Sequence, residues 1–205
     1  MSGISDVIPV TITADTVALD ADGISVATSV GNNAALVIGG ALADGGSVTL
    51  SHGRIVTILS AGDDSAKSFT VVGTDVNGDS QTESITGANA GTATGAVYFK
   101  TIASITAVGT PAGNVSAGVN ASAADVVFTM RSRLKGVFLT STATAGEVDF
   151  LTTSPTGTSI MKLNSVSNAD ATRDVTIPDE GVVFASGIYI QYTVSTFLTM
   201  TVFHA

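Results

Sequence analysis

Short apolar runs recur along the whole chain, separated by clusters of Gly, Asn, Asp and Ser, and this spacing is the strongest constraint on the fold. No segment of about 11 residues or more carries apolar side chains at the i, i+3, i+4, i+7 spacing of an amphipathic helix. The chain also contains 29 Thr, 25 Val and 14 Ile, a third of its 205 residues. Because β-branched side chains favour strands over helices, the sequence predicts an all-β fold.

We expect antiparallel β-sandwich or barrel units, two in number, with an extended N-terminal arm. Residues 1–40 are predicted to form either an arm that completes its strands against another subunit or ordinary edge strands. Residues 41–125 and 126–205 are predicted as the first and second β domains. The boundary is placed in Gly109–Asp125, a small, polar and weakly patterned segment that could equally be a long loop within one fold. Ala117–Ala124, inside this segment, could form a short helical turn.

The clearest local pattern is a hairpin over Ser68–Gly87. At its centre, Asn77 and Gly78 can both adopt the positive φ that a type I′ turn requires. The returning strand is polar, so we expect one face of the hairpin to meet water or a partner. Near the C-terminus, Leu198–Val202 alternates between apolar and polar residues, which predicts a half-buried antiparallel strand.

Charge and composition argue against several classes of protein. A net charge of −9 disfavours nucleic-acid binding, and the absence of Cys excludes disulfides, a thiolate nucleophile and Cys-ligated zinc. No uncharged apolar run approaches the roughly 18 residues of a membrane helix. The start, Met1–Asp6, lacks the basic and apolar regions of a signal peptide. We therefore expect a chain without a membrane or nucleic-acid partner.

Catalytic candidates are few. A Ser-His-Asp triad would have to use His52 or His204, and His52 is interpreted as a solvated residue in a turn. Glu83, Glu147 or Glu180 could serve a glycosidase, but the chain has no Trp and only 5% aromatic residues to stack against sugars. The sequence shows neither a Walker loop nor a dinucleotide-binding glycine pattern. We expect no enzyme activity, no catalytic residues and no cofactor.

Asp75, Asn77 and Asp79 resemble the opening of a calcium loop, because oxygen ligands at alternate positions can wrap a hard cation. The pattern then fails, since Ser80 stands where such a loop needs Gly and Thr86 stands where it needs Glu. Asp and Asn are also favoured in turns for conformational reasons. We favour a turn and predict no metal site, although a calcium ion between acidic loops or subunits stays open.

Three of the eight basic residues, Arg131, Arg133 and Lys135, alternate along a predicted strand and would point to one face. This basic stripe could contact an acidic surface of a partner subunit. It could equally be a solvated face that balances the nearby Asp125 and Asp149. The alternating pattern fits a partner contact and a solvated face equally well.

Several segments resemble turn-and-strand segments that are common in small β-rich virion proteins of tailed bacteriophages: Ile58–Ser65, Phe69–Gly78, Glu83–Gly87, Pro178–Phe184 and Ser186–Ile190. The resemblance implies a virion component that is made in the host cytoplasm, with no catalytic residues to carry over. The low charge of the chain, 12%, agrees with a surface that packs against other subunits.

The leading hypothesis is a capsid decoration, or cement, protein that stabilises the phage head. Its expected partners are the major capsid protein or other virion subunits and further copies of itself in a homo-oligomer. The main alternative is a tail, baseplate or fibre component such as an adaptor, tube or host-contact protein. A carbohydrate-binding β domain is the third.

Overall fold

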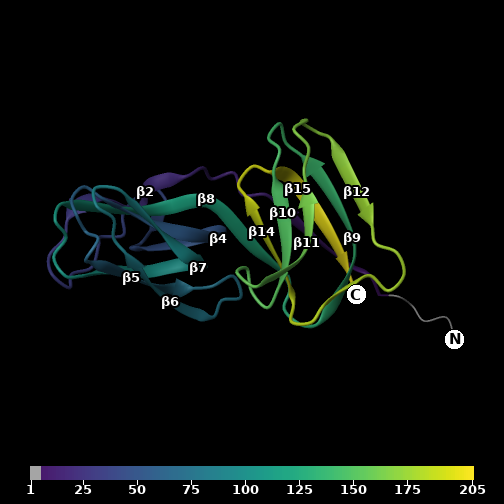
Figure 1. The fold of residues 1–205 in the computed structure, drawn as a ribbon, viewed down its shortest axis with the longest axis horizontal. Coiled ribbons are helices and arrows are strands. Elements are labelled where there is room, and N and C mark those ends of the chain that lie inside the picture. The colour runs from purple at the N-terminus through teal and green to yellow at the C-terminus, as the bar shows by residue number, and fades with distance from the viewer. Residues whose placement is uncertain (1–5) are drawn as a thin grey trace. The chain divides into compact units, whose positions relative to one another are not determined.

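The computed structural model describes residues 6–205, and these form an all-β structure in which strands are joined by turns and loops (Figure 1). The predicted all-β, antiparallel class is confirmed. Within residues 6–205 there is no helix of the length and apolarity that crossing a membrane requires. Residues 1–5 lie outside the described residues, and with them most of the start considered as a signal peptide and the beginning of the predicted arm.

The chain divides into two compact units. Unit 1 combines the residues up to Thr16 with residues 123–205, and unit 2 consists of Val17–Ser122. Strand β1 (Ile8–Thr13) pairs antiparallel with the last strand, β15 (Phe197–His204). Unit 2 is therefore inserted after the first strand of unit 1. The predicted segment 1–40 is thus divided between the units, because the partner of β1 lies near the other end of the sequence.

Unit 2 contains strands of 2 to 17 residues. It contains β2 (Asp20–Ser29), β3 (Ala43–Asp44), β4 (Ser47–Ser60), β5 (Ser68–Thr74), β6 (Ser80–Thr86), β7 (Thr92–Val108) and the beginning of β8 (Asn114–Phe128). The strand order is β8-β4-β7-β5-β6, with β2 on β8 and β3 on β4. One core, largely of Val, Ile and Phe side chains, fills this unit, and Leu36 and Ile38 reach it from an irregular connection.

Strand β8 occupies most of Gly109–Asp125, the segment that was predicted as a boundary between two β units or a long loop. Val115, Ala117 and Val119 are fully buried there, and the chain passes from unit 2 into unit 1 within this strand. At Gly118, a Cβ atom would lie 1.8 Å from the carbonyl oxygen of Asp20 in β2. The small residues therefore permit a close approach of two strands. Residues 114–125 are therefore strand and not a loop or a helical turn, because small residues permit tight packing here, whereas residues 109–113 form the connection between β7 and β8.

Unit 1 is a sandwich of two sheets. Its remaining strands are β9 (Ser132–Ser141), β10 (Glu147–Thr152), β11 (Thr158–Asn164), β12 (Thr172–Thr176), β13 (Val182–Phe184) and β14 (Ile188–Thr193). The small sheet has the order β1-β15-β9-β12, with β13 also on β9, and the second layer contains β11-β10-β14. Leu139 and Met200 of the small sheet share one core with Phe150 and Ile190 of the other layer.

The predicted hairpin is confirmed, but its turn type is not. β5 and β6 pair in continuous register from Ser68 opposite Thr86 to Thr74 opposite Ser80. Of the two central residues only Gly78 has a positive φ, +88°. The loop is closed by the amide of Gly78, which donates to the carbonyl of Asp75 at 3.1 Å. It matches a three-residue hairpin loop that ends in a left-handed glycine, so the type I′ prediction was wrong.

Candidate interaction face

The three predicted basic residues lie at the beginning of β9. Arg131 is exposed in the bend before the strand, whereas Arg133 and Lys135 are half-buried within it. Leu134 between them is fully buried, so Arg133 and Lys135 lie on the solvent side, as strand alternation predicts. The register with β15 shifts between Leu134 and Gly136, which places Lys135 in a β-bulge.

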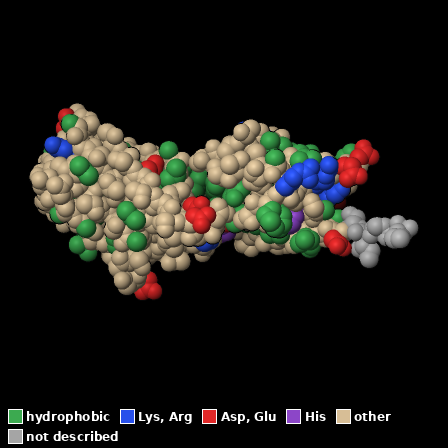
Figure 2. Space-filling model, turned by 90° about the horizontal axis from the view of Figure 1, so that it is seen from below, with side chains coloured by type: hydrophobic (Ala, Val, Ile, Leu, Met, Phe, Trp, Pro, Cys, Tyr) green, Lys and Arg blue, Asp and Glu red, His purple; other side chains and the backbone are tan. Residues whose placement is uncertain are grey.

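Both cations bind the backbone of an acidic turn. The guanidinium Nη1 of Arg133 donates to the carbonyl of Glu180 at 3.2 Å, and Nζ of Lys135 donates to the carbonyl of Asp179 at 3.3 Å. This turn connects β12 and β13, which both pair with β9. Figure 2 shows a group of Lys and Arg atoms beside Asp and Glu atoms on the part of the surface that belongs to unit 1. A guanidinium offers five donors and an ammonium three, so each cation retains donors for a partner.

The two acids named in the solvated-face interpretation engage other residues. Oδ2 of Asp125 accepts a hydrogen bond from the hydroxyl of Tyr192 at 3.1 Å. Asp149 lies on β10, where it engages Ser159 and Lys162. The contact between the basic stripe and a partner stays a prediction.

Exposed apolar side chains lie on the same solvent side of the small sheet as Arg133 and Lys135. Phe138 is 39% exposed, and Val183, which is 38% exposed, lies directly opposite Arg133. Phe203 is half-buried in the neighbouring strand. We call this solvent side the outer face; it comprises Arg133, Lys135, Phe138, Val183, Thr201 and Phe203. It joins Phe and Arg side chains on paired strands, and both of these residue types are enriched at protein interfaces.

The sequence reasoning missed the apolar part of the outer face. Val137, Phe138 and Leu139 are consecutive apolar residues, and in a strand either the outer two or the middle one faces the core, but not all three. Val137 and Leu139 are buried and Phe138 is exposed. A strand that packs on one core can bury alternate residues only. Three consecutive apolar residues were therefore the signal that at least one apolar side chain is exposed.

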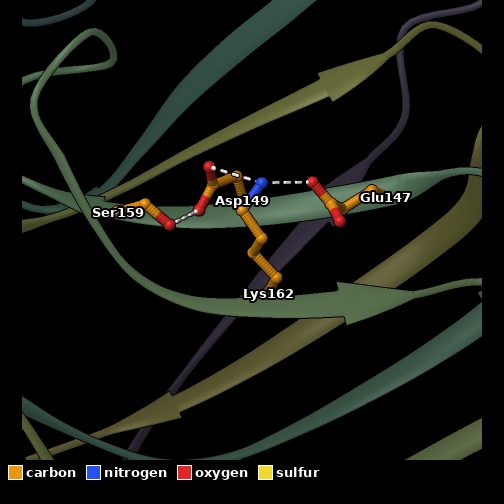
Figure 3. A network of polar contacts seen from close by, with 4 residues as sticks. All are labelled: Glu147, Asp149, Ser159 and Lys162. Carbon is orange, nitrogen blue, oxygen red and sulfur yellow. Dashed lines mark hydrogen bonds and ion pairs between the residues drawn. The ribbon is translucent and has the colours of Figure 1, made fainter.

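A polar network lies on the strand pair β10–β11 (Figure 3). Nζ of Lys162 is 2.6 Å from Oε1 of Glu147 and 3.6 Å from Oδ2 of Asp149. Oγ of Ser159 donates to Oδ1 of Asp149 at 2.5 Å. The hydrogen bond to Glu147 and the charge of Asp149 raise the pKa of Lys162 above its ordinary value. This arrangement is a cross-strand ion pair at the surface.

The glutamates considered for a glycosidase lie on three separate elements. Glu147 belongs to the network on β10, and Glu180 lies in the turn after β12. Glu83 lies on β6 in unit 2, where its Oε1 accepts the amide of Ala96 at 2.5 Å. The carboxylate of Glu147 engages a lysine, and that of Glu83 accepts from a backbone amide.

The two histidines differ in their surroundings. His52 is half-buried in β4, so its predicted place in a turn was wrong. His204 is 2% exposed, and its Nδ1 lies 3.0 Å from Oγ of Ser132, which is 4% exposed. Burial lowers the pKa of His204. Ser132 also donates to the carbonyl of Ala205 at 3.1 Å, so this buried pair fastens the C-terminal end to the beginning of β9.

The Asp75 carboxylate is used by its own turn. Its Oδ1 accepts the amides of Asn77 and Asp79 at 2.8 Å and 3.0 Å, and its Oδ2 accepts Nδ2 of Asn77 at 3.2 Å. Within residues 6–205 no three His, Cys, Asp or Glu side chains form a group that could hold a metal ion. The geometry at Asp75 is that of a turn stabilised by its own side chain.

Comparison of the chain with protein-family models, curated proteins and solved structures finds no match. The fold and the outer face define an all-β chain of two antiparallel units, one of which presents aromatic and cationic side chains on an exposed sheet.

Proposed function

We propose that the chain is a structural protein of a tailed-bacteriophage virion. In this role it decorates the capsid and binds an acidic, partly apolar surface of a capsid subunit through the outer face of the small sheet. The observation that carries the proposal is the exposed ring of Phe138 on the same side of β9 as the cations Arg133 and Lys135. The phage-like turn-and-strand segments support the assignment to a virion.

Physical chemistry explains why such a face suits subunit contact. An exposed aromatic ring gains free energy when a partner covers it, and nearby cations give the contact orientation and speed. Since the strands of the small sheet are held by main-chain pairing, little conformational entropy is lost on binding. The exposed Arg131 extends the positive charge at the edge of this face.

The test is co-sedimentation of the full chain with DNA-free capsids of its own phage. Phe138→Ser and Arg131→Glu should each weaken binding about tenfold or more, as expected for interface residues worth about 1.4 kcal/mol. Ile160→Ser is the matched control, because Ile160 is also an exposed apolar residue of unit 1, 41% exposed, on the other sheet. Ile160→Ser should leave binding unchanged.

If all three variants bind capsids as the native chain does, the outer face has no role in binding and the proposal is overturned. Binding of the chain to tails, with no binding to capsids, would overturn capsid decoration and favour the tail or baseplate alternative. Folding of each variant is checked by its circular dichroism spectrum and melting temperature.

A further inference from the structure

We propose that two copies of this chain associate by antiparallel pairing of their β1 strands, which joins two small sheets into one continuous sheet. Strand β1 is the terminal strand of the small sheet, and within residues 6–205 the sheet order gives it β15 as its neighbour. This dimer does not use the outer face, so it stands independently of the proposed virion function.

The free edge of β1 carries main-chain groups that point away from β15. The amide of Ala14 donates to the carbonyl of Leu198 at 3.1 Å, in the same register that places Thr13 opposite Thr199. In an antiparallel ladder the bonded positions alternate, so Ile12 also bonds to β15. The N–H and C=O groups of Thr11 and Thr13 therefore point to the free edge. Both of these residues are exposed.

β1 lacks the charged side chains found on β6, β11 and β12, the other strands that end a path in the two sheets. β6 carries Glu83, β11 carries Lys162, and β12 carries Arg173 and Asp174. The sequence of β1, Ile-Pro-Val-Thr-Ile-Thr, contains no charge, and Ile8 is 49% exposed. Charges on edge strands oppose pairing between molecules. Of these four terminal strands, β1 is the one that offers a neutral edge.

Pro9 determines which register lets every bonded pair of the dimer exchange both of its main-chain bonds. Proline has no N–H, so a two-fold axis at Thr11 would place Thr13 of each copy opposite Pro9 of the other and leave one bond of that pair unmade. An axis at Ile12 pairs Thr11 of one copy with Thr13 of its partner. Both pairs then exchange two N–H···O bonds, which gives four complete main-chain bonds. The same strand edge is used by both copies, as two-fold symmetry requires.

The first experiment is hydrogen–deuterium exchange of the full chain at several protein concentrations, together with native mass spectrometry. The amides of Thr11 and Thr13 should become protected as concentration rises, in step with the appearance of a dimer. The amide of Ile12, which bonds to β15 in either state, should be protected at every concentration. A monomer throughout, or protection of Thr11 that does not depend on concentration, would overturn the proposal.

The second experiment uses Thr11→Pro, which removes a donor on the free edge. It leaves the main-chain bonds to β15 in place, because proline is tolerated where a strand N–H faces solvent, and it removes the side-chain hydrogen bond between Oγ1 of Thr11 and Oγ1 of Thr201. Thr176→Pro is the matched control. The amide of Ile177 donates to Lys135 of β9 at 2.9 Å, so by alternation the amide of Thr176 faces the free edge of β12. Thr11→Pro should abolish the dimer and Thr176→Pro should preserve it. A dimer that persists in a folded Thr11→Pro variant would refute the β1 interface.

Discussion

Replacing Arg54 with Met tests how much one buried side chain contributes to the stability of unit 2 by binding the backbone near both of its ends. Arg54 lies on β4 and is fully buried. Its Nη1 donates to the carbonyl of Val17 at 2.9 Å, and its Nη2 donates to the carbonyl of Asn120. Val17 begins unit 2, and Asn120 lies two residues before its end at Ser122. One side chain therefore binds the backbone where the chain enters this unit and where it leaves.

The magnitude follows from these two bonds. A hydrogen bond from a charged donor contributes about 1.5–3 kcal/mol, so loss of both costs roughly 3–6 kcal/mol. Met fills much of the space and removes the cost of burying a charge, which places the expected loss near the lower limit, about 3 kcal/mol. For a chain of this size that loss lowers the melting temperature by roughly 6–12 °C.

Differential scanning calorimetry of the full chain measures this shift. The matched control is Lys100→Met, since Nζ of Lys100 also donates to a backbone carbonyl, that of Ser51, but from a half-buried position that water reaches. This control should change the stability by less than about 1 kcal/mol. If Arg54→Met lowers the melting temperature no more than Lys100→Met does, the hydrogen bonds from Arg54 to Val17 and Asn120 do not stabilise the fold, and the reasoning fails.

Two further predictions concern His204 and Asp75. Because burial lowers the pKa of His204 below its ordinary 6.5, the folded state favours the neutral ring, and the stability that depends on it is present above pH 6.5 and lost as the pH falls. Melting temperatures measured between about pH 7.5 and pH 5 should therefore fall less steeply for His204→Asn than for the native chain, and equal slopes would contradict this. Asp75→Ala should destabilise the hairpin by about 1 kcal/mol, because three hydrogen bonds to the carboxylate are lost. Calcium should not change the melting temperature of the native chain, and a calcium-dependent increase would show that the Asp75 carboxylate is available to a cation.

The elements that the sequence predicted well are those whose information is local. The hairpin of β5 and β6 follows from the strand-like runs on either side of Asn77 and Gly78, and the pairing agrees. The alternation of Arg131, Arg133 and Lys135 predicted a shared solvent side, and the structure places Arg133 and Lys135 on it. Such patterns depend on neighbours within a few residues, so one sequence is sufficient to reveal them.

Other features required information that lies far away in the chain. Gly118 and its small neighbours indicated a loop, but the same composition suits a buried strand that β2 approaches closely. Phe138 could have faced the core or solvent, and the choice depended on Val137 and Leu139 packing inward. Arg54 gave no signal of its burial, because its carbonyl partners at Val17 and Asn120 are distant in sequence.

By itself, the sequence determined the fold class, since β-branched side chains and the lack of any helical stripe leave strands as the way to bury the apolar residues. The tertiary structure alone decided the division into units, because β1 finds its partner in β15 almost 200 residues away, as the pairing of Ile8 with His204 shows. It also decided that Thr11 and Thr13 present a free, uncharged edge. Which edge of a sheet remains open depends on the order of all its strands, and no local pattern in one chain contains that order.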